Sequence, residues 1–330
     1  MNKLLVTALV ALVSVANAEE AAKSTAKAAK GGETKAKLEE AKQNKVEGNI
    51  DEEITNARMR AESGSKSKWS VSATATYSGG SIKEPFSKNR ANPTNDPSPE
   101  KVRLGGDVGV RYRMNKNLSV TGGIGYSAVR PFHGMERTEM NTPSVGLSAA
   151  YKMGSIQNSS SLDISYATEK DSVTIGQTAT ASVGQTMLAN VGQTKLTVGL
   201  SLAADYTDFN KRNQTVTLTD GSTAKAVAFQ QDYTLAAYPF AEYEFSDRFQ
   251  FRTVFRPWIY SHQRSADGWT FNKRPWTQSV GLGIVITRDI YLYPNFQFVW
   301  EKWRNADYNI FRNEVADAST FGISATLNVF

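Results

Sequence analysis

From Trp69 onward the sequence is a succession of stretches, each about ten residues long, in which apolar residues alternate with small or polar ones. All 6 Trp, 13 Tyr and 15 Phe of the chain lie in this part. Side chains on a β-strand point alternately to its two faces. A strand with one apolar face and one face of Gly, Ser, Thr, Arg and Glu fits a wall between lipid and water. The alternation therefore predicts an all-β transmembrane fold, an antiparallel up-and-down β-barrel.

The first 18 residues have the three parts of a secretory signal peptide. Lys3 provides the cationic start, an apolar run covers residues 4–15, and three small residues, Ala16 to Ala18, precede Glu19. The run is shorter than the roughly 20 apolar residues that a transmembrane helix needs. We therefore expect cleavage after Ala18 and a location in the outer membrane of a Gram-negative-type cell.

Residues 19–67 form a different region, because they contain no aromatic residue and their ten Lys and Arg balance ten Asp and Glu. Such a composition cannot build a hydrophobic core. We interpret it as a periplasmic arm, partly helical or disordered, in front of a barrel that covers residues 68–330. Four roles stay open for the arm: a linker, a coiled coil, a contact with the peptidoglycan of the cell wall, or a plug inside the barrel.

The number of strands is expected to be about 12, with 10 or 14 as alternatives because residues 168–194 are poor in bulky side chains. An even number places both ends of a bacterial barrel in the periplasm. The predicted strands are 69–78, 102–114, 118–129, 144–153, 159–168, 179–189, 194–207, 232–245, 249–261, 276–287, 291–303 and 320–330.

The connections support this order, because tight turns follow the even-numbered strands and long loops follow the odd ones. The predicted turns are 115–117, 154–157, 246–248 and 288–290. The predicted long loops are 79–101, 130–143, 208–231, 262–275 and 304–319.

Strand parity then separates lipid-facing from lumen-facing side chains. Aromatic residues of the outward set are expected at the membrane interfaces: Trp69, Tyr77, Phe249 and Phe251. The predicted lumen-lining residues are Arg103, Asp107, Arg111, Arg113, Tyr238, Glu242, Arg252, Arg256, Trp258, Tyr260, Tyr291 and Tyr293.

The lengths of the turns also predict cross-strand partners, since a hairpin loop sets the register of its strands. The expected pairs are Glu242 with Arg252, Asp232 with His262, Arg111 with Thr121, Arg113 with Ser119, and Tyr293 with Val285. Large inward side chains gather on few strands, so the lumen is expected to be unevenly filled.

A barrel of about 12 strands is wide enough for a narrow aqueous channel if its side chains do not fill it. We therefore predict a porin-like channel for passive diffusion of small hydrophilic solutes, with anions or oligosaccharides favoured by inward Arg and aromatic residues. With its arginine-lined lumen the predicted barrel resembles the bacterial outer-membrane channels for acidic oligosaccharides, a resemblance of architecture alone. The alternative is a structural barrel that anchors the arm to the cell wall or to partner subunits.

Catalysis is not expected. Of the two His residues, His262 adjoins Ser261, but strand parity puts their side chains on opposite faces, and a nucleophile must reach its base. The sequence has no metal-ligand cluster, phosphate-binding loop or nucleic-acid motif, so neither a cofactor nor nucleic acid is predicted.

The expected partners follow from location. The sequence pI of about 9.2 suits contact with anionic lipopolysaccharide and other outer-membrane lipid. The terminal aromatic residue, Phe330, resembles the signal that the barrel-assembly machinery reads. Homo-oligomerisation is left open.

Overall fold

The structure is a computed structural model of the chain. It describes residues 68–89, 102–115, 117–211, 214–217, 223–226, 230–265, 268–273, 276–287, 289–299 and 319–328. The predicted signal peptide, the predicted arm at residues 19–67 and the proposed assembly signal Phe330 lie outside the described residues.

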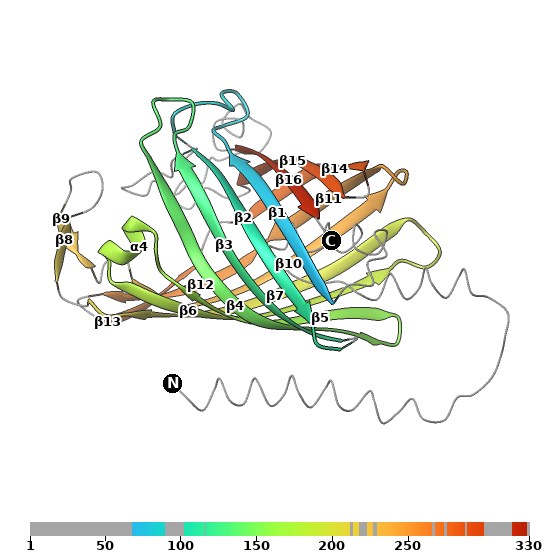
Figure 1. The fold of residues 1–330 in the computed structure, drawn as a ribbon, viewed down its shortest axis with the longest axis horizontal. Helices are drawn as coiled ribbons and strands as arrows, with labels where there is room; N and C mark the ends of the chain where they lie inside the picture. The colour runs from blue at the N-terminus through green and yellow to red at the C-terminus, as the bar shows by residue number, and fades with distance from the viewer. Residues whose placement is uncertain are drawn as a thin grey trace.

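In the described part of the chain, the strands form a closed antiparallel barrel of 12 strands whose spatial order follows the sequence. Figure 1 shows these strands running obliquely around the barrel. They are β1 (Trp69–Ser78), β2 (Arg103–Arg113), β3 (Leu118–Val129), β4 (Arg137–Met153), β5 (Ile156–Tyr166), β6 (Gln177–Asn190), β7 (Leu196–Phe209), β10 (Gln231–Glu244), β11 (Phe249–Arg256) with its continuation β12 (Trp258–Ser265), β14 (Thr277–Thr287) with its extension β13 (Gly268–Lys273), β15 (Ile290–Val299) and β16 (Thr320–Asn328).

The barrel closes where the first strand meets the last. β1 pairs antiparallel with β16, so that Ala75 lies opposite Ala325, and the pairing of β10 with β11 completes the ring of strands. Closure leaves no strand edge whose backbone groups would face lipid unpaired. The predicted fold class and the count of twelve are confirmed.

Four connections carry more structure than expected. The connection after β5 contains a short helix, α4 (Lys170–Thr174), and the connection after β7 contains a small hairpin of β8 (Thr215–Thr217) and β9 (Thr223–Lys225). Most of the predicted loop 262–275 is instead the hairpin formed by β12 and β13. β4 also begins at Arg137, inside the predicted loop 130–143, because its polar first residues continue the ladder with β3 past a bulge at Gly123 to Gly125.

A second bulge, at Pro257, overturns part of the predicted register. Phe240 pairs with Val254, but Ala237 pairs with Trp258, so three residues of the β11–β12 strand oppose two of β10. Proline donates no ladder hydrogen bond, so inside a sheet it is confined to edges and bulges. From Ala237 to Tyr233 every pair is shifted by one residue, and a further irregularity between Tyr233 and Gln231 restores the predicted register at Gln231 and Gln263. His262 therefore pairs with Tyr233, and the predicted pair of His262 with Asp232 is wrong.

The turn between β14 and β15 is shorter than predicted. Thr287 pairs with Ile290, and its Oγ1 accepts hydrogen bonds from the backbone N of Asp289 at 3.2 Å and of Ile290 at 3.1 Å. Val285 consequently lies opposite Tyr291, and the predicted pair of Val285 with Tyr293 is wrong by two residues. A shift of two keeps each side chain on its predicted face.

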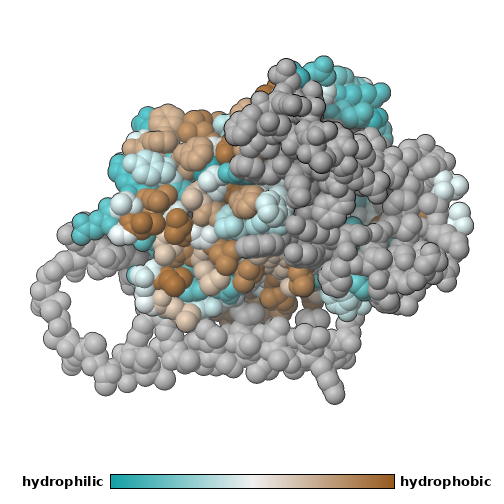
Figure 2. Space-filling view, turned by 180° about the vertical axis from the view of Figure 1, so that it is seen from behind, coloured by the Kyte–Doolittle hydropathy of each residue, from teal (hydrophilic) through white to brown (hydrophobic). Residues whose placement is uncertain are grey.

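Exposed apolar side chains mark the outer wall of the barrel. Val108, Ile124, Leu235, Phe251 and Ile286 are all at least 40% exposed. Seen from behind, brown apolar residues lie across the coloured part of the surface (Figure 2). No helix in the described part of the chain is long and apolar enough to cross a membrane.

Candidate functional site: the inner wall of the barrel

The inner wall is uneven. The large polar and aromatic side chains lie on β10, β11 and β15 and pack against each other. The inward positions of β3 to β7 carry mostly small side chains, such as Ser148, Thr186 and Ser201, and Thr186 is hydrogen-bonded to Ser201 at 2.8 Å. The chain therefore builds one wall of large side chains and one of small ones.

Glu242 and Arg252 occupy the centre of the large-residue wall. They lie opposite each other in the ladder, as the length of the turn at 246–248 predicted. Glu242 is 5% exposed and Arg252 is fully buried. The Cζ atom of Arg252 lies 5.3 Å from the centre of the Tyr293 ring, within the range of a cation–π contact.

Arg256, further along β11, makes a similar contact with Tyr238 of the neighbouring strand β10. The Cζ atom of Arg256 lies 5.9 Å from the centre of the Tyr238 ring, and its Nη1 donates a hydrogen bond of 3.1 Å to Ser279 Oγ. Arg256 is partly exposed, unlike Arg252. Of these two arginines it is the one that offers its charge to solvent.

Two tyrosines of β15 lie over glycines of β14. Gln250 Nε2 donates a hydrogen bond of 2.5 Å to the hydroxyl of Tyr291. A Cβ atom on Gly281 would come within 2.5 Å of the Tyr293 ring, and one on Gly283 would meet Tyr291 and Gln250. The glycines therefore create the space that both tyrosine side chains occupy.

The four predicted lumen residues of β2 have different surroundings. Arg111 is buried opposite Thr121, and Arg113 lies opposite Ser119, as predicted. Asp107, opposite Gly125, is exposed.

Arg103 Nη1 lies 3.8 Å from Glu169 Oε2 in the connection that contains α4. Because β3 and β4 separate β2 from β5, this contact brings that connection over the end of the barrel.

The bulge at Pro257 changes the face of the sheet on which the register places positions Trp258 and Tyr260. The register pairs Trp258 with Ala237 and Tyr260 with Leu235, and Leu235 belongs to the exposed outer set. Parity counted without the bulge had placed both aromatic residues in the inward set. The register therefore corrects the predicted face of both positions.

Three of the four residues predicted for the aromatic girdle are exposed. Trp69 is 56% exposed, with its ring 4.7 Å from that of Tyr112 on β2, and Phe249 and Phe251 are exposed. Tyr77 differs: it is 5% exposed, because Phe86 and Phe132 each place a ring 5.5 Å from its own. The prediction that Tyr77 meets lipid directly is wrong, since loop residues cover it.

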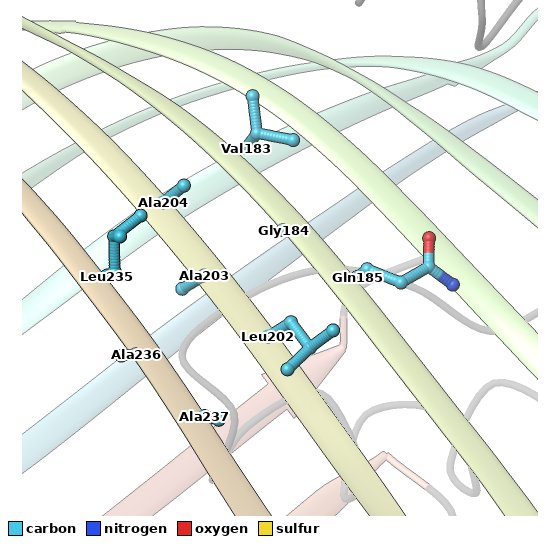
Figure 3. Close-up of a pocket in the computed structure, with 9 residues that line it drawn as sticks. All are labelled: Val183, Gly184, Gln185, Leu202, Ala203, Ala204, Leu235, Ala236 and Ala237. Atoms are coloured by element: carbon cyan, nitrogen blue, oxygen red, sulfur yellow. The ribbon is translucent and has the colours of Figure 1, made fainter. Parts of the chain in front are cut away.

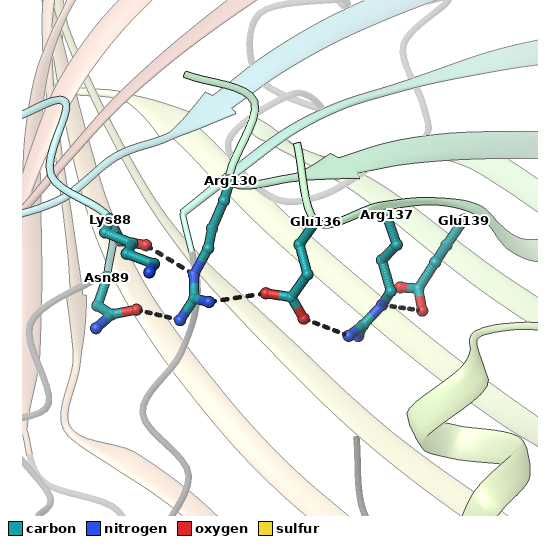
Figure 4. A network of polar contacts seen from close by, with 6 residues as sticks. All are labelled: Lys88, Asn89, Arg130, Glu136, Arg137 and Glu139. Carbon is teal, nitrogen blue, oxygen red and sulfur yellow. Dashed lines mark hydrogen bonds and ion pairs between the residues drawn. The ribbon is translucent and has the colours of Figure 1, made fainter. Parts of the chain in front are cut away.

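A polar network in the loops was missed by sequence reasoning. Arg130 has a positive φ of 53° and joins two loops: its Nη1 contacts Glu136 Oε2 at 2.8 Å, and its Nη2 donates to Asn89 Oδ1 at 2.7 Å. Glu136 also contacts Arg137 at 3.1 Å (Figure 4). A loop network leaves no periodic signal, so the sequence contained no indication of this one.

Gln250 was also not predicted as a site residue, although strand alternation already places it in the inward set.

The described residues include no group of three or more His, Asp or Glu that could hold a metal ion. What the inner wall can do is hold cationic and aromatic groups in fixed positions. Such groups can attract anions and stack against sugar rings.

No protein-family model and no curated protein matches the chain. Solved structures of outer-membrane channels and porins do match. An outer membrane channel from Pseudomonas putida F1 has 7% identity and a TM-score of 0.48, covering 80% of this chain and 97% of that one. The KdgM porin has 11% identity and a TM-score of 0.41, covering 79% and 99%. OmpF of Salmonella typhi, solved with daunomycin, has 8% identity and a TM-score of 0.36, covering 79% and 97%. At these identities the similarity concerns the fold alone.

Proposed function

We propose that the protein is an outer-membrane channel through which small hydrophilic solutes diffuse passively, with anions and acidic oligosaccharides favoured. The signal peptide, cleaved after Ala18, delivers the chain to that membrane, and the barrel spans it. The observation that carries the proposal is the pairing of Arg256 with Tyr238 on the inner wall. A partly exposed guanidinium beside an aromatic ring presents charge to a carboxylate and an apolar face to a sugar ring.

The uneven filling of the barrel supports this function. A wall of Ser, Thr and Gly opposite the large side chains leaves room that a uniformly filled barrel of this strand number would lack. The polar groups on both walls replace part of the hydration of a passing solute. Selectivity would then come from the large-residue wall.

Planar-bilayer recording of the refolded mature chain tests the proposal. We expect ohmic conductance, a reversal potential on the anion side in a KCl gradient, and partial block by an acidic trisaccharide at lower concentrations than by a neutral one. Arg256→Gln should move the reversal potential toward cations and weaken the block about tenfold, the cost of one charge-assisted hydrogen bond.

The control is Arg248→Gln, which removes an exposed cation from the turn before β11 and should change neither quantity. Absence of conductance with and without residues 19–67 would overturn the channel and favour the structural anchor. Conductance that appears only after deletion of 19–67 would identify the arm as a plug.

A further inference from the structure

The outer wall of the barrel carries bulky apolar residues on both sides, but small and polar residues stand among them on one side. On β11, β14, β15 and β16 its exposed outward residues are bulky: Phe249, Phe251, Leu282, Ile286, Phe296 and Leu327. On β5, β6, β7 and β10 the outward positions include Ser160, Ala181, Gln185, Ala204 and Ala237. Exposed bulky residues such as Val183, Leu202 and Leu235 lie on the same strands as these small and polar positions.

Three polar side chains on this side form a connected cluster, which we call the outer polar cluster: Asn158, Ser160 and Gln185. Ser160 Oγ donates a hydrogen bond to Gln185 Oε1, and Gln185 Nε2 donates to Asn158 Oδ1 at 3.3 Å. All three belong to the outward set, because Gln185 pairs with Leu202 across the next ladder and Leu202 is 39% exposed.

The cluster lies deep in the apolar band. Ser160 is five residues beyond the β4–β5 turn at Gly154 and Ser155, and Gln185 is five residues before the end of β6. At a strand tilt of about 40° and a rise of about 3.3 Å per residue, five residues advance about 13 Å along the membrane normal. That is about half of the roughly 25 Å apolar band of such a barrel.

The amides of the cluster have donors to spare. Each carboxamide carries two N–H donors. Within the described residues, Gln185 donates to Asn158, and Asn158 donates only to the backbone carbonyl of Ile156, at 3.3 Å. Lipid tails accept no hydrogen bonds, so a covering of lipid would leave the remaining donors unsatisfied. A covering of protein could satisfy them, because polar side chains join spans across such interfaces.

A hollow lies beside the cluster. It has a volume of about 460 Å³ and is lined by Val183, Leu202, Ala204, Leu235 and Ala237, with Gln185 at its rim. Figure 3 shows the larger Val and Leu side chains around the positions of the small alanines. A depression of this kind can receive a protruding side chain from another surface.

From these observations we infer that the outward face of β4 to β7 and β10 is the interface with a second copy of this chain. Carboxamides donate and accept, so the cluster can pair with itself across a two-fold axis along the membrane normal. Five strands about 4.8 Å apart and an apolar band about 25 Å tall give about 600 Å² per copy. Two copies together reach about 1,200 Å², the lower end of a specific interface. The inference does not depend on whether the barrel conducts.

The test uses the full mature chain in nanodiscs, where light scattering should give the mass of a dimer. The chain has no Cys, so single-cysteine variants report one position each. Ala204→Cys, beside the hollow, should be joined to its counterpart by a short bifunctional maleimide. The matched control is Ala325→Cys, which lies outward on β16 opposite Ala75 and should remain monomeric after the same treatment.

Gln185→Leu should raise the dissociation constant of the dimer about tenfold, the effect of losing one interfacial hydrogen bond. The folding of the Gln185→Leu variant is checked by heat-modifiable gel mobility. The mass of the wild-type protein in nanodiscs is a second, independent measurement. A monomeric mass, or equal cross-linking of Ala204→Cys and Ala325→Cys, would overturn the inference. Two further results would also overturn the inference. One is a monomer that retains lipid, and the other is cross-linking of Ala204→Cys to a cysteine in the arm, Ala41→Cys, within one chain.

Discussion

Glu242 lies directly opposite Arg252 across the β10–β11 ladder, and both side chains are buried on the inner wall. A buried charge that loses its counter-charge is strongly destabilising, whereas loss of both charges costs much less. The pair therefore holds two neighbouring strands in one register while Arg252 also contacts Tyr293.

The first prediction concerns this pair. Arg252→Met should lower the free energy of unfolding by about 3 kcal/mol, because it leaves Glu242 buried beside an apolar side chain. Glu242→Gln should cost a similar amount, and the double variant should cost less than the sum of the two. Urea unfolding in detergent, followed by Trp fluorescence, gives all three values. Additive effects would contradict a direct coupling.

The second prediction concerns the glycines under the tyrosines. Gly281→Ala places a Cβ atom within 2.5 Å of the Tyr293 ring, so the ring or the backbone must shift. We expect a loss of about 1 to 3 kcal/mol in unfolding free energy, typical of overpacking. Gly122→Ala is the matched control, because its nearest neighbour, the carbonyl oxygen of Ser144, would be 3.6 Å away. Equal losses for both variants would exclude the tyrosine contact as the cause.

The third prediction separates the observed register from the one counted without a bulge. Tyr233 and His262 are directly paired, whereas Asp232 is one residue out of step with His262. Cysteines at directly opposed positions can form a disulfide, because their Cα atoms lie within about 5.5 Å. Tyr233→Cys with His262→Cys should therefore oxidise readily, and Asp232→Cys with His262→Cys should not. The reverse result would mean that the bulge at Pro257 is absent.

That bulge shows where sequence reasoning succeeds and where it ends. Alternation identified all twelve barrel strands, because lipid outside and polar groups inside impose a period of two on every strand. It also gave the pairs of Glu242 with Arg252 and of Arg111 with Thr121, since those turns contain no extra residue. A bulge adds one residue and leaves the composition of the strand unchanged, so the faces of Trp258 and Tyr260 could not be counted across it.

Pro257 was the one local signal of this bulge, because a proline inside a sheet marks a bulge or an edge. Tyr77 shows a different limit. Its outward position followed from parity, but its cover of Phe86 and Phe132 comes from loops whose path no periodic pattern specifies. Tyr77 would be exposed if the strands alone were considered, but it is buried in the folded chain.

The fourth prediction concerns the loop network around Arg130. Its guanidinium joins Asn89 in one loop to Glu136 in the next, and its Nε donates to the carbonyl oxygen of Lys88 at 3.3 Å. Arg130→Gly keeps the positive φ that the turn requires and removes all three contacts. Because the network is near the surface, we expect a change in barrel stability below about 1 kcal/mol. Without the contacts of Arg130, the peptide bond after Lys88 should become a preferred trypsin site, with cleavage about tenfold faster, since local opening governs proteolysis of a loop.

Arg137→Gly serves as the control. It removes the contacts to Glu136 and Glu139 and touches neither Lys88 nor Asn89, so cleavage at Lys88 should keep its wild-type rate. Faster cleavage in both variants would mean that the two loops are held by the whole network and not by Arg130.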